Sequence, residues 1–169
     1  PVSLAKFTNM GLVIGSVDNG LARRDIARMV ANHRYSSLWW VDAGNGENYG
    51  QVLIGNVTSQ HLSASFDPKK GICYALPLPT IQRPELLTQQ PPVRDCAGAV
   101  AAGEQGPAIN QAMAALVVEV ARRLIEGSCP WMGLYLDLEA ATLVPVQATP
   151  EAVERVTRVD QRHLVKERR

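Results

Sequence analysis

The stretch GLVIGSVDN at residues 11–19, followed by GLARRDIAR at residues 20–28, decides the fold of this chain. Apolar residues that do not alternate with polar ones, and that glycine bounds, predict a strand buried on both faces. Asn19 can cap the helix expected over about residues 21–32. Asp18 then lies at the carboxyl end of a parallel strand, which is where open α/β sheets bind ligands.

Two arginines occupy an unfavourable position in this helix. Arg23 and Arg24 fall in its first turn, where the positive end of the helix dipole disfavours a cation by about 0.3–1 kcal/mol. One interpretation is a nearby anion, and the other is an ordinary strand-to-helix turn with solvated arginines. The apolar stripe at Ile26, Met29 and Val30 predicts that both arginines face solvent.

Composition and charge exclude several classes of protein. The chain has 169 residues, which suits one domain, and its formal net charge of +1 gives no field that would imply nucleic-acid binding. No apolar run is long enough to span a membrane, so no membrane partner is expected. Its 3 cysteines form no CxxC pair, which predicts a reducing cytoplasm and no zinc site.

The remaining pattern completes an α/β fold. Strands are expected at 38–43 and 51–57, antiparallel to each other across a glycine-rich turn in which Asn45-Gly46 favours positive φ. This turn joins strand to strand and opens no helix, so it is not read as a phosphate loop. Further elements are expected as a short strand at 71–76, a helix at 108–126 with Gly127 as its C-cap, strands at 131–138 and 142–146, and a helix from Pro150.

The long segment from 77 to 106 shows little periodicity and is expected to be either a functional loop or disordered. It contains Cys96, whose pKa Arg94 would lower and Asp95 would raise, so this cysteine is either a weak candidate nucleophile or incidental. The three histidines lie far apart in the sequence and share no catalytic motif, so they are expected at the surface: His33, His61 and His163.

Several short motifs, in order, carry a resemblance to a known family. They are VDN with an arginine four residues on, LWWVDAGNG at 38–46, GQVLIG at 50–55 and INQAMAAL at 109–116. Together they resemble the later part of the ThiF/MoeB superfamily of ubiquitin-activating-enzyme-like adenylyltransferases, and within it the ThiF family of the PRTRC system. The likeness covers about residues 11–146. The fold class it implies is a Rossmann-like α/β sheet of mixed parallel and antiparallel strands.

The resemblance implies an ATP-dependent reaction on a small protein. The C-terminal carboxylate of a ubiquitin-like or sulfur-carrier protein attacks the α-phosphate of ATP, giving an acyl-adenylate and pyrophosphate. Asp18 and Arg23 match catalytic positions, and Asp18 acts near Mg²⁺. Asp18, Asn19 and Gln51 match positions that bind the nucleotide. Family members are dimers, and the broad apolar face of the helix at 108–126 agrees with a homodimer.

Three departures qualify the resemblance. The glycine-rich ATP loop is missing, and so is the sheet unit that carries it, so we expect residues 1–149 to be the C-terminal part of a larger domain, inactive alone, with a terminal helix and tail at 150–169. The family's later asparagine is replaced by Ala27, and its zinc-binding CxxC pairs are absent.

Two rival interpretations remain. One is a non-catalytic module that binds the carrier protein or dimerises. The other is a Rossmann-like oxidoreductase fragment, although the sequence contains no dinucleotide fingerprint.

Overall fold

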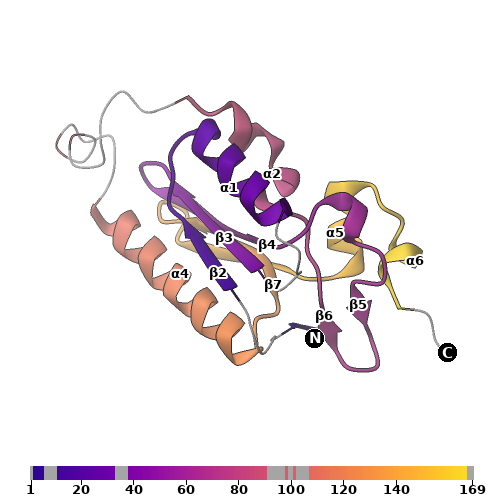
Figure 1. Cartoon of the computed structure of the whole chain (residues 1–169). Helices are drawn as coiled ribbons and strands as arrows, with labels where there is room; N and C mark the ends of the chain where they lie inside the picture. The colour runs from indigo at the N-terminus through magenta and orange to yellow at the C-terminus, as the bar shows by residue number, and fades with distance from the viewer. Residues whose placement is uncertain are drawn as a thin grey trace.

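A computed structural model of the chain describes residues 2–5, 11–32, 38–90, 98, 101 and 107–166. The described residues form a mixed α/β structure with a five-stranded and a three-stranded sheet (Figure 1). The larger sheet has the strand order β2-β3-β4-β7-β8. Its strands are β2 (Gly11–Gly15), β3 (Leu38–Asn45), β4 (Tyr49–Gly55), β7 (Trp131–Asp137) and β8 (Thr142–Gln147).

The larger sheet contains one parallel pair, followed by antiparallel pairs. β2 pairs in parallel with β3, and α1 (Gly20–Asn32) lies between them in the sequence, so the expected strand–helix–strand unit is confirmed. Each of the next neighbours, from β3 to β8, pairs antiparallel. The expected combination of parallel and antiparallel strands is therefore present.

Helices cover both faces of this sheet (Figure 1). The long helix α4 (Pro107–Glu126) lies on one face, whereas α1 and the short α2 (Pro79–Gln82) lie on the other. Successive side chains of β3 point to opposite faces of the sheet, which explains this arrangement. Trp39 belongs to the core on the α4 side, and Trp40 packs with Val30 of α1. The unbroken apolar run of β3 thus reflects burial on both faces.

The end of the chain packs into the same core as α4. α5 (Pro150–Thr157) begins at Thr149, whose side chain accepts a hydrogen bond from the Ala152 backbone, and α6 (Gln161–Leu164) follows. Val153 and Leu164 are buried in the main hydrophobic cluster. A smaller sheet lies nearby, with the order β1 (Ser3–Leu4), β6 (Ile72–Cys73) and β5 (Phe66–Asp67).

None of the helices in the described part of the chain combines the length and the apolar character that a membrane span requires.

Two local expectations were wrong. The predicted loop of 77–106 is not irregular over residues 77–90, since these contain α2 and the 3₁₀ helix η2 (Pro84–Thr88), and most of its remainder lies outside the described residues. Prolines at their first turns pre-set the backbone for such short helices, which carry too few residues to show periodicity. The turn at Gly46 also lacks positive φ, because the Gly46 N–H bonds the Tyr49 carbonyl at 2.9 Å across a wider turn. The C-cap of α4 at Gly127 is confirmed, with a φ of 71°.

The close approach of β4 to the segment before α2 gives a first prediction. A Cβ at Gly55 would lie 2.7 Å from the carbonyl carbon of Pro77 and would also overlap its oxygen. Since both neighbours are backbone, Gly55→Ala should lower the free energy of unfolding by about 1–3 kcal/mol, measured by chemical denaturation.

The control is Gly133→Ala, also within a strand of the same sheet. There the nearest atom to the new Cβ would be Leu53 Cδ2 at 3.2 Å, a side-chain atom that can move. An equal loss of stability in the two variants would contradict the claim that backbone contact decides the cost.

Candidate functional site

One end of the five-stranded sheet gathers the residues that the sequence singled out. Gly15 at the end of β2 pairs with Asp42 of β3, and Gln51 near the start of β4 pairs with Gly44 of β3. Because β4 runs antiparallel to β3, its beginning lies at the same end of the sheet as the carboxyl ends of β2 and β3. Asp18, three residues beyond Gly15, therefore lies at the same sheet end as Gln51.

Asp18 and Asn19 form the entry to α1. Asn19 Oδ1 accepts a hydrogen bond from the Ala22 N–H at 2.9 Å, so the expected N-cap is confirmed. Asn19 Nδ2 donates to Asp18 Oδ1 at 3.2 Å. The Asp18 side chain is exposed, which leaves a carboxylate open to solvent beside the N-terminus of a helix.

Arg23 does not face solvent, contrary to the prediction from the apolar stripe. The residue is only 1% exposed, and its Nε donates to Asp42 Oδ2 at 3.0 Å. Its Nη1 donates to Gln89 Oε1. The anion near the first turn of α1 is thus a carboxylate of the chain itself, whereas Arg24 is exposed as expected.

Asp42 is a fully buried carboxyl group. Burial raises its pKa to about 6, because the loss of hydration outweighs the attraction of Arg23. Among the residues that the structure describes, Asp42 Oδ1 and Trp40 Nε1 have no hydrogen-bond partner. A Cβ at Gly15 would lie 3.2 Å from Asp42 Oδ1 and 2.8 Å from Trp40 Nε1. Glycine at this position therefore lets β2 run close to both polar groups.

The segment after η2 closes over the start of α1. The Gly20 N–H donates to the Gln89 carbonyl at 2.9 Å, and the side chain of Gln89 accepts from Arg23. A Cβ at Gly20 would overlap the Leu87 carbonyl oxygen, so only glycine permits this contact. Arg23 consequently joins three parts of the fold: α1, β3 and the residues that follow η2.

Gln51 has a partner of its own. Its Oε1 accepts from Arg83 Nη1 at 2.9 Å, and the Arg83 guanidinium carbon lies 5.8 Å from the centroid of the Tyr135 ring. Arg83 also forms an ion pair with Glu85. At the same sheet end, Asn45 Nδ2 donates to Asn110 Oδ1 at 3.0 Å, which connects β3 to the start of α4.

The remaining candidates lie elsewhere. Cys96 and His33 fall outside the described residues. His61 and His163 are exposed, as expected. The two other cysteines are buried, and burial raises the pKa of Cys73 to about 12 and that of Cys129 to about 11, so neither forms a reactive thiolate at neutral pH. In the described ranges, no group of three or more histidine, cysteine or acidic residues could hold a metal ion.

Asp42, Gln89 and Arg83 were not predicted as members of this site. A sequence signal existed for Asp42, since it is the acidic residue in an otherwise apolar strand, and Arg23 is a cation in a disfavoured helical position. Pairing the two would have required knowing that Asp42 points to the α1 face. Gln89 and Arg83 offered no comparable signal.

Two comparisons with known proteins gave no match. No protein-family model matches the chain, and no curated protein sequence matches it.

The buried carboxyl group predicts a dependence of stability on pH. The folded protein binds the Asp42 proton more tightly than the unfolded chain, in which the pKa of this aspartate is near its ordinary value of 3.8. Stability from this residue is therefore present at low pH and lost as the pH rises through about 6. The free energy of unfolding should fall by about 1 kcal/mol between roughly pH 5 and pH 7, measured by urea denaturation.

In the Asp42→Asn variant, this fall in the free energy of unfolding with rising pH should disappear. The matched control is Asp160→Asn, because Arg162 holds the pKa of Asp160 at about 2 and the residue stays ionised across the whole range. A slope that survives in Asp42→Asn, or disappears in Asp160→Asn, would contradict the assignment to Asp42.

Proposed function

We propose that this chain is the C-terminal part of a ThiF-like adenylyltransferase with a Rossmann-like sheet, acting in the cytoplasm on the C-terminal carboxylate of a ubiquitin-like or sulfur-carrier protein. One observation carries the proposal. An exposed carboxylate, Asp18, lies at the carboxyl end of a parallel strand beside the N-terminus of α1. A helix N-terminus favours phosphate oxygens, and a neighbouring carboxylate suits the cation that accompanies them.

Asp18 is the residue suited to Mg²⁺. This cation prefers carboxylate and phosphate oxygens and keeps several waters, so one exposed carboxylate together with ATP is a sufficient donor set. When bound, Mg²⁺ would neutralise phosphate charge while the carrier carboxylate attacks the α-phosphate and pyrophosphate leaves. Asn19 keeps Asp18 at the helix start through its cap and its hydrogen bond.

Arg23 takes a different role in this proposal from the one that the resemblance implies. Its guanidinium already contacts Asp42 and Gln89 inside the protein. Arg23 is therefore a positioning residue, which fixes α1 against β3 so that Asp18 and the helix N-terminus keep their orientation. Gln51, held by Arg83 at the same sheet end, would border the nucleotide.

A second candidate function is a non-catalytic binding module for the carrier protein. The observation that favours it is the edge strand β8, where Leu143 and Val144 are about half exposed. An exposed apolar edge strand can accept a strand from another protein. The two functions differ in their need for ATP.

The substitution Asp18→Asn separates these functions. We expect it to abolish ATP–pyrophosphate exchange in the full-length protein, supplied with its carrier protein, because asparagine lacks the charge that holds Mg²⁺. Asp18 is exposed, and the amide oxygen of asparagine can accept the same hydrogen bond from Asn19 Nδ2, so the melting temperature should stay within a few degrees.

The matched control is Asp25→Asn, since Asp25 is an exposed acid on the same helix that pairs with Arg28 at the surface. Normal exchange in Asp18→Asn would contradict the catalytic proposal. For residues 1–169 alone, calorimetry should detect little or no Mg-ATP binding, because the backbone N–H groups of a glycine loop normally supply much of the phosphate binding.

The homodimer is proposed from α4. Most of its apolar face is buried under the chain's own sheet, but Val118 is 68% exposed and Ile125 is 56% exposed. Light scattering should give the mass of a dimer, and the double variant Val118→Lys/Ile125→Lys should give a monomer with unchanged circular dichroism. A wild-type monomer at high concentration would contradict this arrangement.

A further inference from the structure

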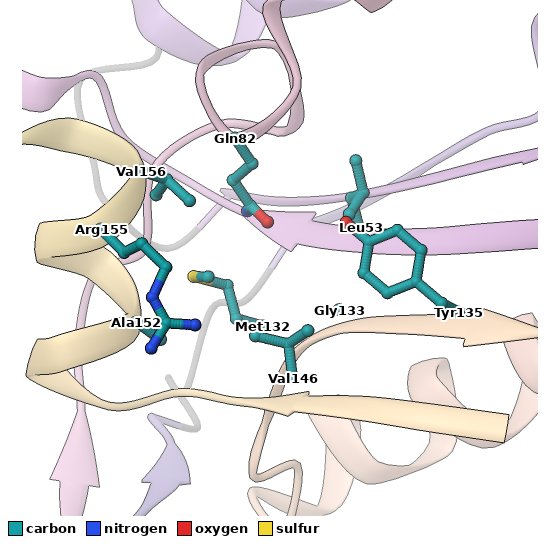
Figure 2. Close-up of a pocket in the computed structure, with 9 residues that line it drawn as sticks. All are labelled: Leu53, Gln82, Met132, Gly133, Tyr135, Val146, Ala152, Arg155 and Val156. Atoms are coloured by element: carbon teal, nitrogen blue, oxygen red, sulfur yellow. The ribbon is translucent and has the colours of Figure 1, made fainter.

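A cavity of about 150 Å³ lies between α5 and the five-stranded sheet (Figure 2). The cavity lies on the sheet face that α1 and α2 cover, because Leu53 lines it and points to the same face as its strand partner Asp42. Apolar side chains supply most of its wall: Leu53, Met132, Val146, Ala152 and Val156. A dry cavity of roughly this size in another protein binds benzene, so about six carbon atoms fit in such a space.

The cavity has one cation at its wall. Figure 2 shows the Arg155 side chain leaving α5 with its guanidinium beside Ala152. Among the residues that the structure describes, Arg155 makes no hydrogen bond or ion pair. Its planar group of N–H donors therefore stays available, and the shape that it matches best is a carboxylate bound through both oxygens.

The charged residues that neighbour Arg155, on α5 and directly after it, form no ion pair with it in the described part of the chain. Glu151, Glu154 and Arg158 line the adjoining groove together with Arg155. Glu154 accepts a hydrogen bond from Gln161 Nε2 at 3.2 Å. Two acids and two arginines balance in this groove, so attraction of an anion depends on direct contact with Arg155 rather than on a general positive field.

Gln82 supplies a fixed acceptor. The residue is 9% exposed, and its Nε2 donates to the carbonyl oxygens of Ile54 at 2.8 Å and Pro77 at 2.7 Å. These two bonds determine the orientation of the amide, because its oxygen cannot take the place of the donor. In the described part of the chain, Gln82 Oε1 receives no hydrogen bond, and Figure 2 shows this amide reaching into the space among the cavity residues.

We propose that this cavity binds a small aliphatic carboxylate that carries one hydrogen-bond donor, such as a hydroxy acid of about six carbons. Its carboxylate contacts the Arg155 guanidinium, its hydroxyl donates to Gln82 Oε1, and its carbon chain packs on Leu53, Met132 and Val146. This proposal makes no use of Asp18, and it stands whether or not the chain takes part in adenylation.

The test uses three probes of similar shape: 2-hydroxy-4-methylpentanoate, 4-methylpentanoate and the uncharged 4-methylpentanamide. Binding is followed by NMR at the Met132 methyl group, which lies in the cavity wall. A ligand with about nine non-hydrogen atoms should bind with a dissociation constant of roughly millimolar order. We expect the hydroxy acid to bind more tightly than the plain acid, and the amide to bind at least about tenfold more weakly than the hydroxy acid.

Two variants assign the contacts. Arg155→Gln should weaken both acids about tenfold and leave the affinity of the amide unchanged, whereas the control Arg158→Gln should change none of the affinities. Ala152→Leu should fill the cavity and abolish binding of all three probes, with melting curves confirming that the variant folds. Equal affinity for acid and amide, equal losses in the two arginine variants, or no shift at Met132 up to about 10 mM would overturn the proposal.

Discussion

The buried ion pair between Arg23 and Asp42 is the constraint on which this end of the fold depends. Taking both groups out of water is costly, and for Asp42 this cost outweighs the attraction of Arg23, because burial raises its pKa to about 6. Apolar residues of the same volume can be equally stable, so the pair is not explained by stability alone. Its effect is to fix one arrangement: α1 against β3, with Gln89 as a third partner. Gly15 and Gly20 belong to the same arrangement, because each allows a close backbone approach beside the pair.

The elements that the sequence predicted are those whose signals are local. The strand at 11–15, the cap at Asn19 and the glycine at the end of α4 each depend on a few neighbouring residues, and the structure contains all three. The expectation that this strand is buried on both faces was wrong, because β2 is an edge strand of the sheet and Ile14 is 50% exposed. The short helices α2 and η2 escaped prediction because four or five residues cannot display a helical period. The long apolar helix of 108–126 was predicted almost to its limits, since its stripe repeats over 20 residues.

The same distinction between local signals and packing applies to the candidate site. The position of Asp18 followed from its own strand and helix, and the place of Gln51 followed from the antiparallel turn that returns the chain to the same sheet end. The burial of Arg23 did not follow, because it depends on the face of β3 to which Asp42 points. A helical stripe identifies the apolar side of a helix, but it does not reveal an acidic partner that the packing brings beneath a polar residue.

The two adjacent tryptophans of β3 have a consequence for observing this protein. Trp39 and Trp40 are both fully buried, yet they lie in different hydrophobic clusters on opposite faces of one strand. Indole emission depends on its surroundings, so each residue reports on the layer that covers it. Because Trp131 also emits, replacing Trp131 and one of these two residues by phenylalanine leaves the other as the optical reporter of either the α4 layer or the α1 layer. The order in which the two layers assemble during refolding thereby becomes a measurable quantity.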